Sequence, residues 1–544
     1  MTGITLLLAA AAAGFALSKW LRVPAIPVLI LMGFVATLPG LIDEDLLVDA
    51  LVLGLTVLVF VAGIELNPGR VGRHKKAALQ VGLLQFVALG GAGVGLTLLL
   101  GFDVQAAVYL GLALTASSTL VVVRLLQQRG QLFEPVGRLV IGVLLLQDFL
   151  VILSIPVLTR LPDGGEAVAF GLLATLALMG LSWIFLRWVG PWTIERVSFD
   201  EETLLLVVLG VLFLFLGLSE LFQLPLVAGA FFAGVALSSF PVSSLVRGQL
   251  KSLSDFFSAL FFTALGGFLV VPDPAVVLQA VALAVAVLVI TPPLVALVTE
   301  RAGFTARSAL LGGLLLSQTS EFSLVVGLQG VALGHLGPEV FTLIVLTTLF
   351  TMILTPVVAT DRVTWALMRI HPFRARRTGA ERPRDHVLLV GCGSGGVSLL
   401  ETLIVGPYPV VVVDEDPALV EHLQESGVDA IRGDASDVEV LREAGADQAR
   451  VVVSMLRRAQ DNAPLLAYAR EVPVFVRAFN VADAHWIEGR KGRPILFSEA
   501  AADEFLRWME ATDGGRHPVS EEELPDLLEG SDAPAPSPGT DASH

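Results

Sequence analysis

The chain has 544 residues, of which 54% are hydrophobic, and its mean hydropathy of +0.77 excludes an ordinary soluble protein. Its formal net charge of −16, with much of the acidic excess near the C-terminus, argues against a nucleic-acid partner, which requires a basic face. The single cysteine, Cys392, excludes a disulfide framework and a cysteine-based metal site, and we expect no tightly bound metal.

Long apolar runs predict an α-helical membrane protein in contact with lipids. A spanning helix needs about 20 apolar residues, or fewer where it is broken or buried in protein. The first run lacks the basic segment of a signal peptide and is interpreted as a membrane helix. We predict thirteen spans, at residues 3–18, 24–39, 46–66, 77–100, 105–126, 137–159, 166–190, 201–219, 223–240, 253–271, 275–299, 306–330 and 338–360.

The loops between these spans alternate in charge. One set of alternate loops carries fifteen basic residues, whereas the other set carries acidic residues and only one cation, Arg160. Basic loops stay on the cytoplasmic side of a membrane. The pattern therefore predicts a multi-pass protein of a bacterial-type inner membrane, with its N-terminus outside and everything after residue 360 in the cytoplasm.

An internal repeat relates spans 2–6 to spans 9–13. Shifting the sequence by 201 residues without a gap places Pro24 on Pro225, Gly33 on Gly234 and Phe60 on Phe261. Equivalent spans are seven apart, an odd number, so the two copies must face opposite sides of the membrane. Such inverted-topology repeats are typical of secondary transporters, which bind their substrates near the bilayer midplane at discontinuous helices.

Spans 5 and 12 are the predicted discontinuous helices, because short polar residues interrupt each one at its middle. Where a helix unwinds in lipid, such side chains supply partners for freed backbone groups, and the broken ends can hold an ion. The alternative is that hydroxyl residues merely allow close helix packing. The candidate ion-site residues are Thr115, Ser117, Ser118 and Thr119 in span 5, and Gln318, Thr319 and Glu321 in span 12.

Asp148 lies at the centre of span 6, where a carboxylate costs at least about 2.5–3.5 kcal/mol. Burial disfavours its charged form, so a proton and a monovalent cation can compete for it. Gln147 adds an amide that cannot titrate. A protonated Asp148 that only bonds a neighbouring helix is the structural alternative, and Glu321 either ligates the ion or neutralises the dipoles of the broken helices.

The sequence after a basic linker predicts a doubly wound, Rossmann-like α/β domain. A buried strand at residues 386–390 leads into a G-x-G-x-x-G run, Gly391 to Gly396, and then a helix. A second strand at 410–413 ends in Asp414, 21 residues after Gly393, the spacing expected for an acid that binds a ribose hydroxyl. Further strands are predicted at 429–431, 450–454 and 474–477.

Several motifs resemble the monovalent cation:proton antiporter-2 family, in its Kef-type potassium/proton antiporter branch. They are Gln147-Asp148, Ser117-Ser118-Thr119, residues 63–68 and residues 318–322. Because electrogenic relatives carry two adjacent acids at the position of Gln147 and Asp148, the resemblance implies electroneutral exchange. It also implies a homodimer and an elevator-like movement of spans 5, 6, 12 and 13. The family usually has glycine in place of Ser320.

The cytoplasmic region resembles a regulator-of-potassium-conductance (TrkA-N-like) domain, through Gly433 to Ser436 and Asp461-Asn462. This resemblance implies a regulatory site for NAD(H) or for an adenine nucleotide such as AMP, whereas the alternative is a domain that binds nothing. The implied nucleotide-binding residues are Gly391, Gly393, Ser394, Gly396, Asp414, Asp434 and Asn462.

The combined prediction is an electroneutral potassium/proton antiporter, not an enzyme, regulated by a nucleotide. Its predicted parts are a transmembrane domain at 1–362, a linker at 363–384, the Rossmann-like domain at 385–512 and a disordered acidic tail at 513–544. Sodium/proton exchange stays open, since both ions use oxygen ligands. A ligand-gated cation channel and a membrane-anchored NAD(H) enzyme are the other classes, and neither a carbonyl filter motif nor a substrate domain is present in the sequence.

Overall fold

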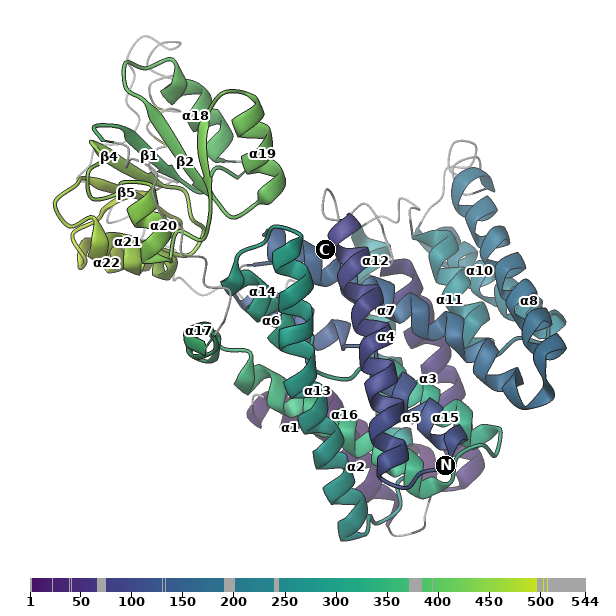
Figure 1. The fold of residues 1–544 in the computed structure, drawn as a ribbon. Helices are drawn as coiled ribbons and strands as arrows, with labels where there is room; N and C mark the ends of the chain where they lie inside the picture. The colour runs from purple at the N-terminus through teal and green to yellow at the C-terminus, as the bar shows by residue number, and fades with distance from the viewer. Residues whose placement is uncertain are drawn as a thin grey trace, which may run out of the picture. The chain divides into compact units, whose positions relative to one another are not determined.

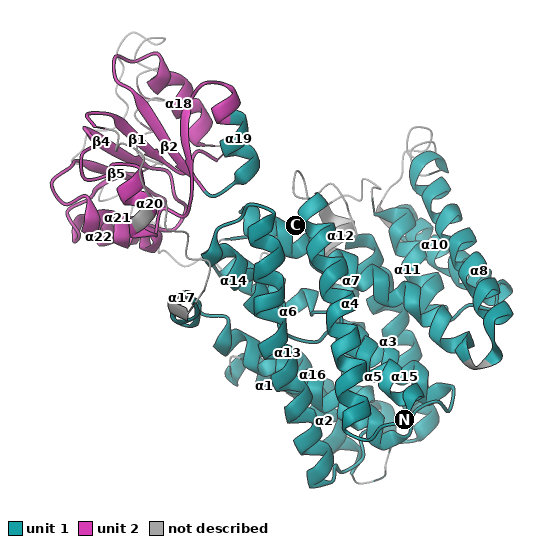
Figure 2. Ribbon diagram, in the orientation of Figure 1, with its two compact units in different colours: residues 1–378, 415–422 teal, residues 379–414, 423–544 magenta. Residues whose placement is uncertain are grey.

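The chain folds into a helical unit and an α/β unit. This computed structural model describes residues 2–496, with residues 502 and 506, apart from residues 22, 39, 41, 66–74, 130, 133, 190–200, 239–243, 371–383 and 394. The predicted tail at 513–544 therefore lies outside the described residues. By their contacts, residues 1–378 with 415–422 form one unit and residues 379–414 with 423–544 form the other (Figure 2). Residues 415–422 lie between two strands of the α/β unit in the chain and are described with that unit below.

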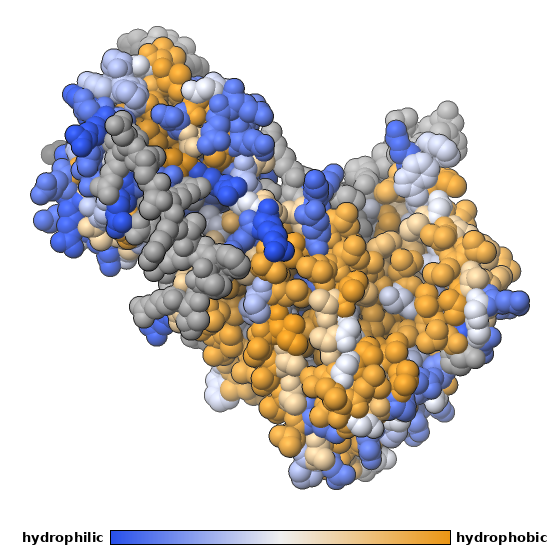
Figure 3. Space-filling view, in the orientation of Figure 1, coloured by the Kyte–Doolittle hydropathy of each residue, from blue (hydrophilic) through white to orange (hydrophobic). Residues whose placement is uncertain are grey.

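The helical unit contains a helix or a pair of helices at each predicted span (Figure 1). Eight helices in the described part are long and apolar enough to cross a membrane, the others are shorter, and the number of crossings stays a prediction. Apolar side chains dominate the visible face of this unit (Figure 3). The helices are α1 (Thr2–Leu21), α2 (Ala25–Thr37), α3 (Glu44–Glu65), α4 (Lys75–Leu99), α5 (Val104–Ala113), α6 (Thr119–Gln128), α7 (Pro135–Arg160), η2 (Leu161–Asp163), α8 (Gly165–Ile184), η3 (Phe185–Val189), α10 (Glu201–Leu221), α11 (Leu226–Leu237), α12 (Ser244–Gly266), α13 (Pro274–Arg301), α14 (Ala306–Leu315), α15 (Glu321–Ala332), α16 (Pro338–Val358) and α17 (Asp361–Ile370).

Two spans are interrupted at the predicted places. Span 5 consists of α5 and α6, separated by residues 114–118, and span 12 consists of α14 and α15, separated by residues 316–320. Helix α7 packs against α6, α14 and α15, and α5 packs against α15. The two breaks confirm the predicted interrupted helices. The helix that carries Asp148 packs against both interrupted spans.

Four helices, α2, α3, α11 and α12, pack with their backbones in close approach. A Cβ atom on Gly33 would collide with the carbonyl group of Thr263 in α12, and one on Gly234 would collide with that of Phe60 in α3. Without a hydrophobic driving force between helices in lipid, such small residues allow the backbone contact that stabilises the bundle. These two glycines are a pair related by the predicted repeat.

The gap-free repeat register is correct at the start of α2 and α11 but wrong by one residue at the breaks. Ala25 and Leu226 begin their helices 201 residues apart, whereas the caps Ser118 and Ser320 begin α6 and α15 202 residues apart. Helix α13 is 28 residues long and its counterpart α4 is 25. Differences in helix length of this kind shift the register within an otherwise regular repeat.

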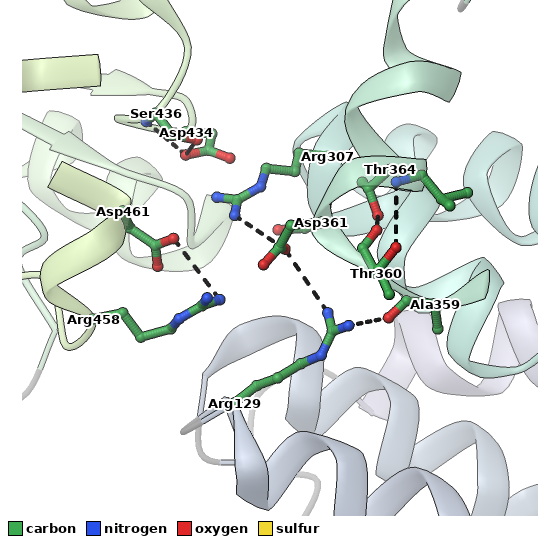
Figure 4. A network of polar contacts seen from close by, with 12 residues as sticks. Arg129, Arg307, Ala359, Thr360, Asp361, Thr364, Asp434, Ser436, Arg458 and Asp461 are labelled. Carbon is green, nitrogen blue, oxygen red and sulfur yellow. Dashed lines mark hydrogen bonds and ion pairs between the residues drawn. The ribbon is translucent and has the colours of Figure 1, made fainter. Parts of the chain in front are cut away.

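A short helix after the last span was not predicted. Asp361, the first residue of α17, lies 3.5 Å from Arg307 of α14 and 3.9 Å from Arg129, the residue that ends α6 (Figure 4). Arg129 also donates a hydrogen bond to the carbonyl group of Ala359. The start of α17 is thus attached to one half of each interrupted span.

The α/β unit is a six-stranded parallel sheet in the order β3-β2-β1-β4-β5-β6, the doubly wound arrangement of a dinucleotide-binding fold. All neighbouring strands pair in parallel, so their carboxyl ends meet at one edge. The strands are β1 (Val387–Val390), β2 (Val410–Asp414), β3 (Asp429–Arg432), β4 (Val451–Ser454), β5 (Val474–Ala478) and β6 (Arg493–Leu496), and the helices are α18 (Gly396–Ile404), α19 (Pro417–Glu425), α20 (Val438–Glu443), η4 (Ala459–Asn462), α21 (Ala463–Tyr468) and α22 (Val481–Glu488). The first five strands confirm the prediction, and β6 was missed.

Candidate functional site

Asp148 and Gln147 lie on the buried side of α7. Pro135 starts this helix, since its fixed φ suits the first turn, and a 26-residue apolar sequence carries it through the unit. The side chain of Asp148 is 5% exposed and that of Gln147 is fully buried. A carboxyl group and an amide are therefore held inside an apolar bundle by one continuous helix.

The first break supplies partners to both side chains. The Ser117 backbone N–H donates to Gln147 Oε1 at 3.1 Å, and the Thr119 hydroxyl donates to Asp148 Oδ2 at 3.0 Å. Ser118 caps α6 by accepting from the N–H of Val121. A freed backbone N–H of the unwound segment and the hydroxyl group of the first residue of α6 thus orient the two side chains of α7. Thr115 bonds only back to its own helix, in the hydrogen bonds found for it.

The second break is joined to the first by hydrogen bonds. The Ser117 hydroxyl donates to the carbonyl of Leu316 at 2.7 Å, and the Gln318 amide donates to that of Ser118 at 3.5 Å. Freed carbonyl groups in one break are therefore satisfied by side chains of the other, as a lipid-embedded helix break requires. The two breaks form one polar crossing beside Asp148.

Thr319 faces α16 rather than Asp148 in the hydrogen bonds found for it. Its N–H donates to the Thr351 hydroxyl at 3.1 Å, and its hydroxyl lies 3.1 Å from that of Thr348 and 3.0 Å from that of Thr351. These two threonines of α16 were not predicted as site residues. The Thr351 hydroxyl bonds the backbone of the second break and the Thr348 hydroxyl bonds the Thr319 side chain, so both threonines support the break.

Four buried polar atoms at the crossing lack a hydrogen-bond partner among the described residues. They are Gln147 Nε2, Asp148 Oδ1, Gln318 Oε1 and Glu321 Oε2. A buried acceptor left unpaired costs about 1–3 kcal/mol, and more when it is charged. Three of the four atoms are oxygens, which are the ligands that a monovalent cation needs. These oxygens make the crossing a candidate site for a proton or an ion.

Three carboxyl groups interact electrostatically at this crossing. Glu321 and Glu65 are both close enough to act on Asp148. Glu321 is the first residue of α15, where a negative charge is favourable beside the helix N-terminus, and Glu65 is the exposed last residue of α3. Within the described residues, no group of three His, Cys, Asp or Glu side chains is placed to hold a metal ion.

The glycine loop of the α/β unit lies at the carboxyl edge of the sheet. Gly391 has a φ of +79°, and a Cβ on Gly396 would lie 2.7 Å from the Gly391 carbonyl oxygen. The turn therefore requires glycine at both positions. Asp414, at the end of β2, accepts a hydrogen bond from the N–H of Cys392 at 2.6 Å. The carboxylate thus lies against the loop that it was predicted to accompany.

The other predicted nucleotide residues are placed differently. Asp434 follows β3 and accepts hydrogen bonds from the N–H and the hydroxyl of Ser436, at 2.8 and 2.6 Å, so it orders its own turn. Asn462 is fully buried, and its amide donates to the carbonyl of Arg458 at 3.2 Å. Gly393 lies in the loop with open space at its Cβ position, and Ser394 lies outside the described residues. Only the glycines and Asp414 are thus brought together by the hydrogen bonds found.

Comparison with known proteins identifies both units. Residues 4–360 match the sequence model of the transmembrane region of the sodium/hydrogen exchanger family. The chain belongs to this family. The exchanger also carries a TrkA-N domain, whose model matches residues 387–491. It is therefore a membrane cation/proton antiporter with a TrkA-N regulatory domain, a transporter rather than an enzyme, as predicted.

Relatives of the exchanger share most of its length. It is 26% identical over 502 residues to YbaL of Escherichia coli (strain K12), covering 85% of this chain and 88% of that protein. It is 27% identical to the glutathione-regulated potassium-efflux system protein KefC of Enterobacter sp. (strain 638), covering 79% of this chain and 70% of that protein. The structure of the sodium proton antiporter MjNhaP1 from Methanocaldococcus jannaschii matches with a TM-score of 0.54 and 15% identity, over 68% of this chain and 98% of that one, and so shares the fold.

A pair of similar tripeptides in the exchanger marks the internal repeat at the interrupted spans and was not used in the prediction. Gly101-Phe102-Asp103 and Gly303-Phe304-Thr305 lie 202 residues apart, and each precedes the first half of an interrupted span. Gly101 and Gly303 have φ values of +90° and +97°, and Asp103 and Thr305 cap α5 and α14. These paired turns and caps would have given the correct register at the breaks.

Proposed function

We propose that the exchanger is an electroneutral potassium/proton antiporter whose single exchange site is Asp148. The proposal depends on one observation, the different hydrogen bonding of the two oxygen atoms of this buried carboxyl group. Oδ2 accepts one hydrogen bond from Thr119, while Oδ1 has no partner among the described residues. One oxygen is thus held in place and the other is available to a proton or a cation, which compete for it.

Electroneutral exchange follows from the neighbours of Asp148. Gln147, the adjacent side chain on α7, accepts a hydrogen bond from the break and cannot titrate. Glu321 at the start of α15 is proposed to keep its charge and to offset the positive ends of the broken helices. One proton and one monovalent cation then exchange at one acid, and no net charge crosses the membrane.

Potassium is proposed as the cation because a relative covering most of the chain is named a potassium-efflux protein. The proposal includes alternating access by movement of α5–α7 and α14–α16, a homodimer, and an inner membrane with the N-terminus outside. It also includes a cytoplasmic domain at 385–512 that binds NAD(H) or an adenine nucleotide at the glycine loop and Asp414 and regulates exchange. The domain boundaries at 362 and 384 stay predictions.

Proteoliposomes test this function. Potassium added outside should change the internal pH in vesicles with the wild-type protein, whereas a solid-supported membrane recording should detect no net charge movement. Asp148→Asn should abolish the pH change, and Asp163→Asn, an exposed acid after α7, serves as the matched control. Exchange at the wild-type rate in Asp148→Asn would refute the site, while a response to sodium but not to potassium or rubidium would refute only the choice of cation.

A further inference from the structure

Arg160 ends α7, the helix that carries Asp148, and its side chain reaches two other parts of the helical unit. Its Nη2 atom donates a hydrogen bond of 2.6 Å to the carbonyl oxygen of Gln223, in the turn between α10 and α11. Its guanidinium carbon lies 4.9 Å from the centroid of the Phe170 ring in α8. A Cβ on Gly171, the next residue of α8, would lie 2.8 Å from the Arg160 Cδ atom. The side chain therefore packs against α8 and is fastened at its tip to the turn.

The turn that accepts this bond has an ordered backbone. Gln223 has a φ of +54°, and its N–H donates to the carbonyl of Glu220 at 2.9 Å. The N–H of Leu224 donates to the carbonyl of Ser219 at 2.8 Å, and the Ser219 hydroxyl donates to that of Pro225 at 3.0 Å. A left-handed residue with such bonds is a common helix end, although glycine is favoured there. The accepting carbonyl group is thus held by hydrogen bonds on both sides of Gln223.

A second contact joins α7 to α11 beside Asp148. The ring centroids of Phe149 in α7 and Phe231 in α11 lie 6.3 Å apart, and Phe231 is fully buried. Helix α11 in turn packs against α3 and α10. The Asp148 helix is thus in contact with α11 next to the candidate exchange site, and with the turn before α11 at its own end.

These contacts join helices that move in the proposed function to helices that stay in place. Helix α7 moves with the interrupted spans, whereas α8, α10 and α11 do not. A path for ions between the two groups can open toward the end of α7 only if the groups separate there, and a charge-assisted hydrogen bond opposes that separation. Arg160 is also the only cation in its set of predicted loops. The attachment at this end of α7 therefore depends on one side chain.

We propose that Arg160 is a positioning residue for exchange. By fastening the end of α7 to the turn between α10 and α11, it stabilises the state in which Asp148 is closed to the side of the membrane where α7 ends, the predicted outside. The bond breaks each time the site opens to that side. Its loss therefore favours the state that is open there, and the apparent affinity of a ligand rises with the population of the state that binds it. This inference rests on the alternating access in the proposed function.

Potassium-dependent proton exchange in sealed membrane vesicles of both orientations tests the assignment. Arg160→Gln removes the charge from the bond, and losing such a contact at an exposed place shifts an equilibrium about fivefold. The apparent KM for potassium should therefore fall about fivefold on the side where α7 ends and should not fall on the opposite side. Phe170→Leu, which removes the stacked ring and keeps the hydrogen bond, should give a smaller shift in the same direction.

Arg138→Gln is the matched control. Arg138 is an exposed cation of the same helix, in its first turn, and its substitution should leave the apparent KM unchanged on both sides. An unchanged KM in Arg160→Gln, or an equal change on the two sides, would overturn the inference while leaving exchange at Asp148 intact. Absence of cation-dependent proton exchange by the wild-type protein would overturn the proposed function and this inference with it.

Discussion

If Asp148 is the exchange site proposed above, we predict that the hydroxyl group of Thr119 sets the competition between the proton and the cation there. In Thr119→Val the side chain keeps its shape but loses the 3.0 Å hydrogen bond to Asp148 Oδ2. That bond stabilises the carboxylate, which is the form that binds a cation, more than the protonated acid. A hydrogen bond to a charged group contributes about 1.5–3 kcal/mol, and the lower value applies here because Thr119 is only partly buried. The apparent KM for potassium should rise about tenfold at neutral pH.

Potassium-dependent proton movement in proteoliposomes, measured from pH 6.5 to pH 9, tests this reasoning. The increase in KM should shrink at alkaline pH, where protons no longer compete. Thr119→Ser should behave as the wild type, and Thr115→Val is the matched control because that hydroxyl bonds to the carbonyl of Leu112 within α5. An increase that persists unchanged at pH 9 would refute the competition and make the hydroxyl a direct cation ligand. An unchanged KM at all pH values would show that the bond has no effect on exchange.

Two further predictions concern the TrkA-N domain. His386 is fully buried, and burial lowers its pKa below the usual value of 6.5. Below about pH 6.5 the folded domain therefore binds fewer protons than the unfolded chain. The domain should lose stability as the pH falls through this range. Thermal unfolding of the full-length protein between pH 5 and pH 8 should show a smaller acid-dependent loss in His386→Gln, and equal losses would contradict this. Burial first, and the charge of Asp414 second, raise the pKa of the Cys392 thiol from 9.0 to about 11. Alkylation at pH 8 should therefore be about a hundredfold slower than in the urea-unfolded protein, and comparable rates would contradict the burial.

The membrane part of the fold was predictable where polar residues interrupt apolar runs. Asp148 and the two breaks stand out from the sequence because each costs free energy in lipid and so carries a strong signal. Thr348 and Thr351 were missed because a threonine in an apolar helix gives no sign of which group on another helix it will bond. The repeat register failed at the breaks because unequal helix lengths cannot be seen in a gap-free comparison.

The α/β unit was predictable where strands are apolar and buried. Strand β6 was missed because it begins with Arg493-Pro494, and proline is tolerated only at the edge of a sheet, the place that β6 occupies. Helix α17 was missed because its first two residues, Asp361 and Arg362, are charged and therefore indicated the end of the last span and the start of the linker. The contact of Arg160 with the turn between α10 and α11 depends on how distant helices pack, which residue spacing alone does not give.

The central claim is that a proton and a cation bind the same carboxyl group and exclude each other. Exchange rates at varied potassium concentration and varied pH on the same side of the membrane test it most directly. The account predicts that acidification raises the apparent KM for potassium in proportion to the proton concentration while the maximal rate stays constant. A maximal rate that falls with acid at a constant KM would mean that the two ions occupy separate sites, and it would contradict the account.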